Sequence, residues 1–73
     1  MAEETVRSEI AGTVWKIELA PGAKVAEDDV VMILESMKME IPVLAPCDGT
    51  LAAILVEEGA AIAEGQAVAT VTT

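Results

Sequence analysis

The two halves of this chain repeat one another at an offset of 37 positions (49 − 12), which aligns Gly12-Thr13 with Gly49-Thr50. Further identical pairs at this offset are Ile17 and Ile54, Gly22-Ala23 and Gly59-Ala60, Ala26-Glu27 and Ala63-Glu64, and Val31 and Val68. Such self-similarity indicates one supersecondary unit used twice. Because neither half is large enough to stand alone, we expect the two to pack their apolar faces together about a pseudo-twofold axis.

Strands are the predicted elements of each half. Apolar residues skip one step of the alternating pattern in both halves, at Val14, Ile17 and Leu19 and again at Leu51, Ile54 and Val56. This skip predicts a β-bulge in the same place twice. No segment has a helical period, so we predict an all-β, flattened β-sandwich. The chain is expected to be a single domain over residues 1–73, with a repeat of about 12–35 and 49–72.

The composition argues against an active site within the chain itself. Seventy-three residues are too few to bury a substrate cleft and a core together. The single cysteine, Cys47, cannot form an intrachain disulfide, and the chain has no histidine, the commonest metal ligand and general base. We therefore predict no catalytic residues and no metal site.

Charge and hydropathy also argue against two classes of partner. Thirteen acidic against four basic residues give a net charge of −9, which repels nucleic acid and anionic membranes. No apolar run approaches the roughly 20 residues that cross a bilayer, and residues 1–5 do not begin a signal peptide. The expectation is a cytoplasmic protein with neither nucleic acid nor a membrane as its partner.

One predicted hairpin has an unusual turn. Residues 30–34 and 41–45 are predicted strands, so the chain must reverse between them, with Met37-Lys38 at the centre. Tight hairpins prefer Asn-Gly or Asp-Gly there, because these residues tolerate positive φ. The glycines at 12, 22, 49, 59 and 65 are all predicted to be ordinary turn residues. A broken rule at a single exposed turn indicates a function for Lys38.

The surroundings of Lys38 favour an acceptor of modification over a nucleophile acting alone. A nucleophilic lysine needs burial or a nearby cation, whereas Lys38 lies between Glu35 and Glu40. Another enzyme could deprotonate the amine and acylate it. At the offset of 37, the symmetry partner of Lys38 would fall at positions 1 and 75, so we expect Lys38 at one end of the molecule and Met1 and Thr73 at the other.

Along nearly its whole length the chain resembles a biotinyl domain of the biotin/lipoyl attachment family. The resemblance rests on residues 35–40 (Glu-Ser-Met-Lys-Met-Glu), on Pro21-Gly22 and the later glycine turns, and on residues 45–50. It implies a barrel-sandwich hybrid of two four-stranded antiparallel sheets, with biotin joined to Lys38 by an amide. Met37 and Met39 would be flanking recognition residues. Glu35 would help ligases to tell biotin acceptors from lipoyl acceptors, or would only solubilise the hairpin.

The resemblance implies a carrier without catalytic activity. Biotin protein ligase would attach biotin to Lys38, a biotin carboxylase would load carboxylate onto it, and a carboxyltransferase would pass the carboxylate to an acceptor such as an acyl-CoA. One alternative is a lipoyl carrier of a 2-oxoacid dehydrogenase or of glycine cleavage. Met37 and Met39 argue against it, because that family more often has an Asp-Lys-Ala hairpin. Another is an unmodified adaptor module, which retention of Lys38 disfavours.

Overall fold

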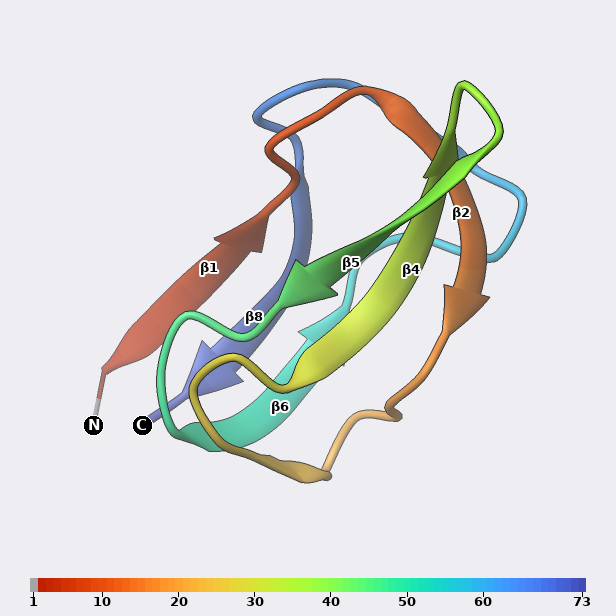
Figure 1. Cartoon of the computed structure of the whole chain (residues 1–73). Coiled ribbons are helices and arrows are strands. Elements are labelled where there is room, and N and C mark those ends of the chain that lie inside the picture. The colour runs from red at the N-terminus through yellow and green to blue at the C-terminus, as the bar shows by residue number, and fades with distance from the viewer. Residues whose placement is uncertain (1) are drawn as a thin grey trace.

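A computed structural model describes residues 2–73, and Met1 lies outside the described residues. These residues form eight strands and no helix (Figure 1). The strands are β1 Glu3–Arg7, β2 Gly12–Ile17, β3 Lys24–Val25, β4 Val30–Ser36, β5 Met39–Leu44, β6 Gly49–Ile54, β7 Ala61–Ile62 and β8 Ala67–Thr72. Over this part of the chain there is accordingly no helix long and apolar enough to span a membrane.

The strands form two four-stranded antiparallel sheets, which confirms the predicted fold class. One sheet has the order β1-β8-β6-β3 and contains the strands nearest the two chain ends, so we call it the terminal sheet. The other has the order β5-β4-β2-β7 and carries the turn with Lys38, so we call it the hairpin sheet. The short strands are exchanged between the halves, since β3 pairs with β6 and β7 pairs with β2.

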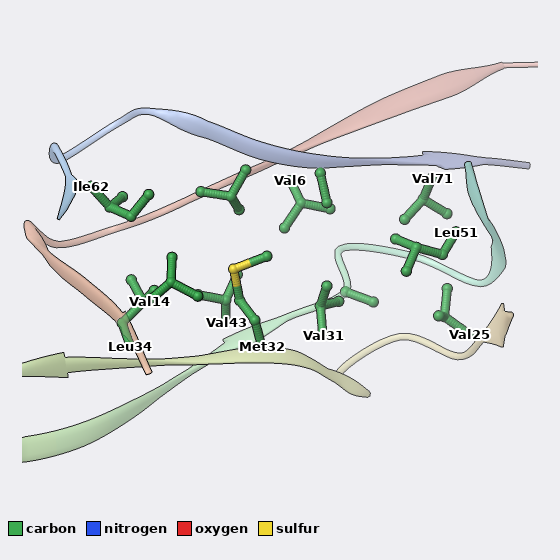
Figure 2. Packing of buried hydrophobic residues seen from close by; sticks show 13 residues of the cluster. Val6, Val14, Val25, Val31, Met32, Leu34, Val43, Leu51, Ile62 and Val71 are labelled. Carbon is green, nitrogen blue, oxygen red and sulfur yellow. The ribbon is translucent and has the colours of Figure 1, made fainter. Parts of the chain in front are cut away.

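A single apolar core fills the space between the sheets. Figure 2 shows its side chains, including Met32 of β4 and Val71 of β8, lying between the two layers. Its buried members are Val6, Val14, Val25, Val31, Met32, Leu34, Val43, Ala45, Leu51, Ile62, Val68, Ala69 and Val71. Met32 and Leu34 are fully buried. Burial of such side chains contributes roughly 1.5–3 kcal/mol each, so β4 is held firmly where it leads into the Lys38 turn.

The two predicted bulges are present. The pairing of β2 with β4 shifts between Val14 and Lys16, and the pairing of β6 with β8 shifts between Leu51 and Ala53. These positions correspond at the offset of 37. A bulge adds one residue on one strand and bends it. β2 and β6 therefore both bend, at positions that correspond in the two halves.

Backbone hydrogen bonds join the halves in a reciprocal way. The Gly22 N–H donates to the Leu51 carbonyl at 2.7 Å, and the Gly59 N–H donates to the Val14 carbonyl at 2.7 Å. Both glycines have positive φ, at 96° and 89°, which a glycine adopts without steric cost. Each glycine turn thus fastens onto the central strand of the other half.

Gly12 and Gly49 have a different role, and the interpretation of them as turn residues is wrong. They begin β2 and β6 and are not among the glycines with positive φ. A Cβ on Gly12 would lie 2.8 Å from the Glu35 carbonyl oxygen. A Cβ on Gly49 would collide with the Thr72 carbonyl oxygen. Glycine is needed at both positions because a neighbouring backbone passes too close for a side chain.

Candidate functional site

The candidate site is the turn that joins β4 to β5. Ser36 pairs with Met39 as the last step of the ladder, so the loop has only two residues, Met37 and Lys38. Their φ values are 52° and 66°. Positive φ at both central residues is the type I′ combination that matches the twist of a hairpin. The predicted reversal at Met37-Lys38 is confirmed.

This backbone conformation is unfavourable for the residues that adopt it. Left-handed φ values cost a residue with a side chain roughly 1–2 kcal/mol, and neither methionine nor lysine is enriched there. Elsewhere among residues 2–73, positive φ outside glycine occurs only at Asp28, with φ of 72°. Leu34, three residues before Met37, is fully buried and anchors the strand that leads into the turn. Strain held at one exposed turn is a feature of functional sites.

Lys38 itself is exposed. Within residues 2–73 its amine forms neither a hydrogen bond nor an ion pair, and the ion pair that these residues do form joins Lys16 to Glu18 at 3.5 Å. The Lys38 side chain therefore needs to break no contact when it enters another protein. The amine is therefore open to an external enzyme.

Met37 and Met39 flank the lysine and are both open to solvent. Met37 is 91% exposed and Met39 59% exposed. Large apolar side chains held in water on each side of one polar group are a typical feature of a contact surface. Methionine is flexible and polarisable, so it adapts to differently shaped partners. The structure thus brings Lys38 and both predicted flanking residues together at one tip.

Glu35 lies at the base of this tip. It pairs across the hairpin with Glu40, and both side chains are exposed. Two carboxylates directly opposite each other repel and offset part of the hairpin's stability. They also give the approach to Lys38 a negative potential, which favours a cationic partner surface.

Pattern analysis of the sequence does not find the contribution of Gly12. Because Gly12 has no side chain, β2 can lie close to the Glu35 carbonyl oxygen. A Cβ on Gly12 would also lie 3.5 Å from the Ser36 Cβ. Gly12 therefore supports the base of the hairpin from the neighbouring strand. Gly12 repeats at 49 in the sequence, but Gly22 likewise repeats at 59, so repetition alone does not reveal this role.

The turn between β4 and β5 lies at the opposite end of the molecule from the start of β1 and the end of β8 (Figure 1). There the Thr73 N–H donates to the Ala2 carbonyl at 2.8 Å. Thr73 and Ala2 correspond to Ser36 and Met39 at the offset of 37. The predicted separation of Lys38 from Thr73 is confirmed, and the part of that prediction concerning Met1 falls outside the described residues.

Comparison with known proteins identifies the family. The sequence pattern of the family described as biotin-requiring enzyme matches residues 2–71. The chain belongs to this family. The resemblance to biotinyl domains noted from residues 35–40 is thereby confirmed.

Two relatives are similar in length to this chain. The chain is 41% identical to the biotinylated protein TB7.3 homolog of Mycobacterium leprae, over 97% of this chain and 99% of the relative. It is 39% identical to the biotin/lipoyl attachment protein of Bacillus subtilis, over 84% of each chain.

Other relatives are much longer. The urea carboxylase of Kluyveromyces lactis contains a domain that superposes with a TM-score of 0.93 at 35% identity, covering 99% of this chain and 6% of that one. The biotin-dependent acyl-coenzyme A carboxylase alpha3 subunit of Mycobacterium leprae is 42% identical over 90% of this chain and 11% of the subunit. The chain thus spans only a small part of these carboxylases. The lipoyl domain of the 2-oxoglutarate dehydrogenase complex from Azotobacter vinelandii gives a lower TM-score of 0.71, at 32% identity, over 86% of this chain and 80% of that domain.

Proposed function

We propose that the protein carries covalently attached biotin on Lys38 and serves a biotin-dependent carboxylase, of the kind that acts on an acyl-CoA. The observation that carries this proposal is the exposed Lys38 amine, held on a strained two-residue turn between two exposed methionines. Membership of the biotin-requiring family supports biotin as the attached group. The protein itself supplies no catalytic residue in this proposal.

Lys38 fits the proposed attachment chemically. Inside a biotin protein ligase the ammonium would lose a proton, and Nζ would attack the acyl carbon of biotin activated as its adenylate. The new C–N bond would replace the bond to AMP, and Nζ would lose a second proton to become an amide nitrogen. The chain would thereby lose one positive charge, so that its formal net charge would change from −9 to −10.

The role of the scaffold is to present the group and to restrict its position. When attached, biotin would carry a carboxyl group on its ureido ring between a biotin carboxylase and a carboxyltransferase. The lysine arm would extend from a rigid hairpin, because β4 is fixed by its buried side chains. A long, flexible arm on a rigid tip keeps the attached group at high local concentration near a docked enzyme.

Met37, Met39 and Glu35 would act at the protein contact. The two methionines would provide apolar area to each enzyme that handles the tip, since both are largely exposed. Glu35, next to Glu40, would place negative charge where the ligases discriminate between acceptors. We also place the protein in the cytoplasm, together with the enzymes proposed to act on it.

Intact-mass spectrometry tests this function directly. The protein is expressed separately with a biotin protein ligase and with a lipoyl ligase, and its mass is measured after each. The proposal expects a complete biotinyl adduct with the first enzyme. An adduct only with the lipoyl ligase would assign the chain to a 2-oxoacid dehydrogenase or to glycine cleavage. No adduct with either enzyme would favour an unmodified adaptor.

A further inference from the structure

The methionines of this chain differ sharply in their access to solvent. Met37 and Met39 are 91% and 59% exposed at the tip, whereas Met32 is fully buried between the sheets. Figure 2 shows the Met32 sulfur enclosed by the other side chains of the core. A small oxidant therefore reaches the two tip methionines from solvent, but it reaches Met32 only when the sandwich opens.

The fold does not depend on either tip methionine. Met37 lies in the two-residue loop beyond the last pair of the ladder, which joins Ser36 to Met39. The counterpart of Met39 at the offset of 37 is Ala2, a small residue in the same scaffold. Side chains that stay in water contribute little apolar burial to folding. Both methionines can therefore become polar without disturbing the core.

The charge at the base of the tip favours an uncharged oxidant. Glu35 and Glu40 face each other there, and the whole chain has a net charge of −9. The resulting negative potential keeps anionic oxidants away from the tip. Hydrogen peroxide is small and uncharged at neutral pH, so this potential does not exclude it.

Cys47 is poorly suited to sense the same oxidant. It is only partly accessible to solvent. Burial raises the pKa of its thiol, and the negative charges of Glu4, Asp48 and Glu27 raise it further. Peroxide attacks the thiolate, and the raised pKa leaves less thiolate at a given pH. The exposed sulfur at the tip is thus the better placed site for reversible oxidation.

We propose that Met37 and Met39 form a reversible oxidation site that switches off the carrier, a consequence that rests on the function proposed above. Hydrogen peroxide transfers one oxygen atom to the sulfur of each side chain. The S–O bond forms as the O–O bond breaks, and the second oxygen leaves as water with both hydrogens. The sulfur loses two electrons and the peroxide gains them. Methionine sulfoxide reductases reverse the step with a dithiol as reductant, which becomes a disulfide while the oxygen leaves as water.

Oxidation changes what the tip offers to an enzyme. A sulfoxide is polar and chiral, whereas the thioether is apolar. Met37 and Met39 lie on the two sides of Lys38, so oxidation makes both flanks of the amine polar. A sulfoxide oxygen that is buried at a protein contact without a hydrogen-bond donor weakens that contact. Enzymes that act at Lys38 therefore bind the oxidised tip less tightly.

Peptide mapping tests the oxidation site. Wild-type protein is incubated with hydrogen peroxide at neutral pH, and dithiothreitol then reduces sulfenic acid or disulfide at Cys47 but leaves methionine sulfoxide. Tandem mass spectrometry follows the addition of one oxygen to each methionine with time. We expect Met37 and Met39 to be oxidised at least about tenfold faster than Met32. Oxidation of Met32 as fast as that of Met37 would overturn the proposed site.

Enzyme kinetics tests the consequence. Oxidised and untreated protein are compared as substrates of a biotin protein ligase and then, with biotin attached to completion, of a biotin carboxylase. Biotin is attached after the peroxide is removed, so that its own thioether is not oxidised. We expect oxidation to lower kcat/KM for the carrier about tenfold in both reactions, and methionine sulfoxide reductases to restore it.

The matched control is the double variant Met37→Leu/Met39→Leu. It keeps two apolar side chains of similar volume but has no sulfur at the tip. Each protein is compared with the same protein before peroxide treatment, and treatment should not change the rate of the double variant. A fall in its rate would place the effect at another residue and overturn the switch.

Two further outcomes separate the inference from the proposed function. If Met37 and Met39 are oxidised but both reactions keep their rates, the switch is overturned while Lys38 remains the attachment site. If untreated wild type accepts no biotin, the proposed function fails. The peptide masses then still decide whether the tip methionines are the oxidation site.

Discussion

The two ends of this molecule differ although the scaffold between them is nearly symmetric. At one end Ser36 and Met39 are joined by a strained turn that presents Lys38. At the other end their counterparts, Thr73 and Ala2, are hydrogen-bonded to each other but belong to the two chain ends. The comparison shows that the duplicated strands supply rigidity, while the candidate function lies where the symmetry is broken. Variants in the two regions test how far that separation extends.

The largest contrast is expected between Lys38 and another exposed lysine. Lys38→Arg should abolish biotin attachment completely while leaving the melting temperature unchanged, because a guanidinium is not deprotonated in proteins. The control is Lys24→Arg, in β3 of the terminal sheet, which should remain fully biotinylated. A streptavidin blot after expression with biotin protein ligase measures both. A positive blot for Lys38→Arg would remove Lys38 as the attachment site.

The free energy of unfolding should be most sensitive at the glycines that let a neighbouring backbone pass close by. Gly49→Ala should lower the free energy of unfolding by roughly 2–3 kcal/mol, because the new methyl group meets the Thr72 carbonyl oxygen and the Val71 side chain. Gly22→Ala should lower it by only about 1 kcal/mol, since space is open there and only the positive φ is strained. Urea denaturation compares the two. An equal or smaller loss for Gly49→Ala would contradict the packing described for that strand.

A smaller effect is expected at the turn itself, where one substitution should raise the stability of the fold and slow biotin attachment. Met37→Gly should raise the free energy of unfolding by about 0.5–1 kcal/mol, because glycine adopts the positive φ without strain. The same change should slow biotin attachment by removing a side chain that is 91% exposed. Asp28→Gly is the control, since it relieves a similar φ far from the turn and should leave attachment unchanged. Destabilisation by Met37→Gly would show that the turn is not strained.

The smallest contrast is at Cys47, whose counterpart in the first half is Ile10. Partial burial raises the pKa of the Cys47 thiol, and the negative charges of Glu4, Asp48 and Glu27 raise it further. Less thiolate is then present at a given pH, so alkylation should reach its half-maximal rate at a higher pH than for a free thiol. Iodoacetamide labelling across a pH series measures this. A profile displaced to lower pH would contradict the environment assigned to Cys47.

Much of the fold can be predicted from the sequence because its duplication fixes so many positions together. The bulges follow from an apolar skip that occurs twice, and the turn at Met37-Lys38 follows from the two strands that enclose it. Pattern analysis does not predict β1, although residues 39–44 shifted by 37 fall on residues 2–7. That signal is weak because β1 and β5 share few identical residues.

Other features cannot be derived from residue types alone. Glycine serves either a positive φ or a close backbone contact, and nothing in the sequence separates Gly12 from Gly22 in this respect. The outward direction of Trp15 and Val30 is hidden from pattern analysis for a similar reason. The bulges change which residues point outward, so Trp15 and Val30 take their places on the outer face only once the register is known.

The most direct test of the account is to locate the modified residue in wild-type protein. The protein is expressed with biotin protein ligase and digested, and tandem mass spectrometry maps the biotinyl group onto the peptides. The account predicts a single modified position, Lys38, with Lys16 and Lys24 unmodified. A biotinyl group on either of those lysines, or none on Lys38, would contradict the claim that the strained turn is the attachment site.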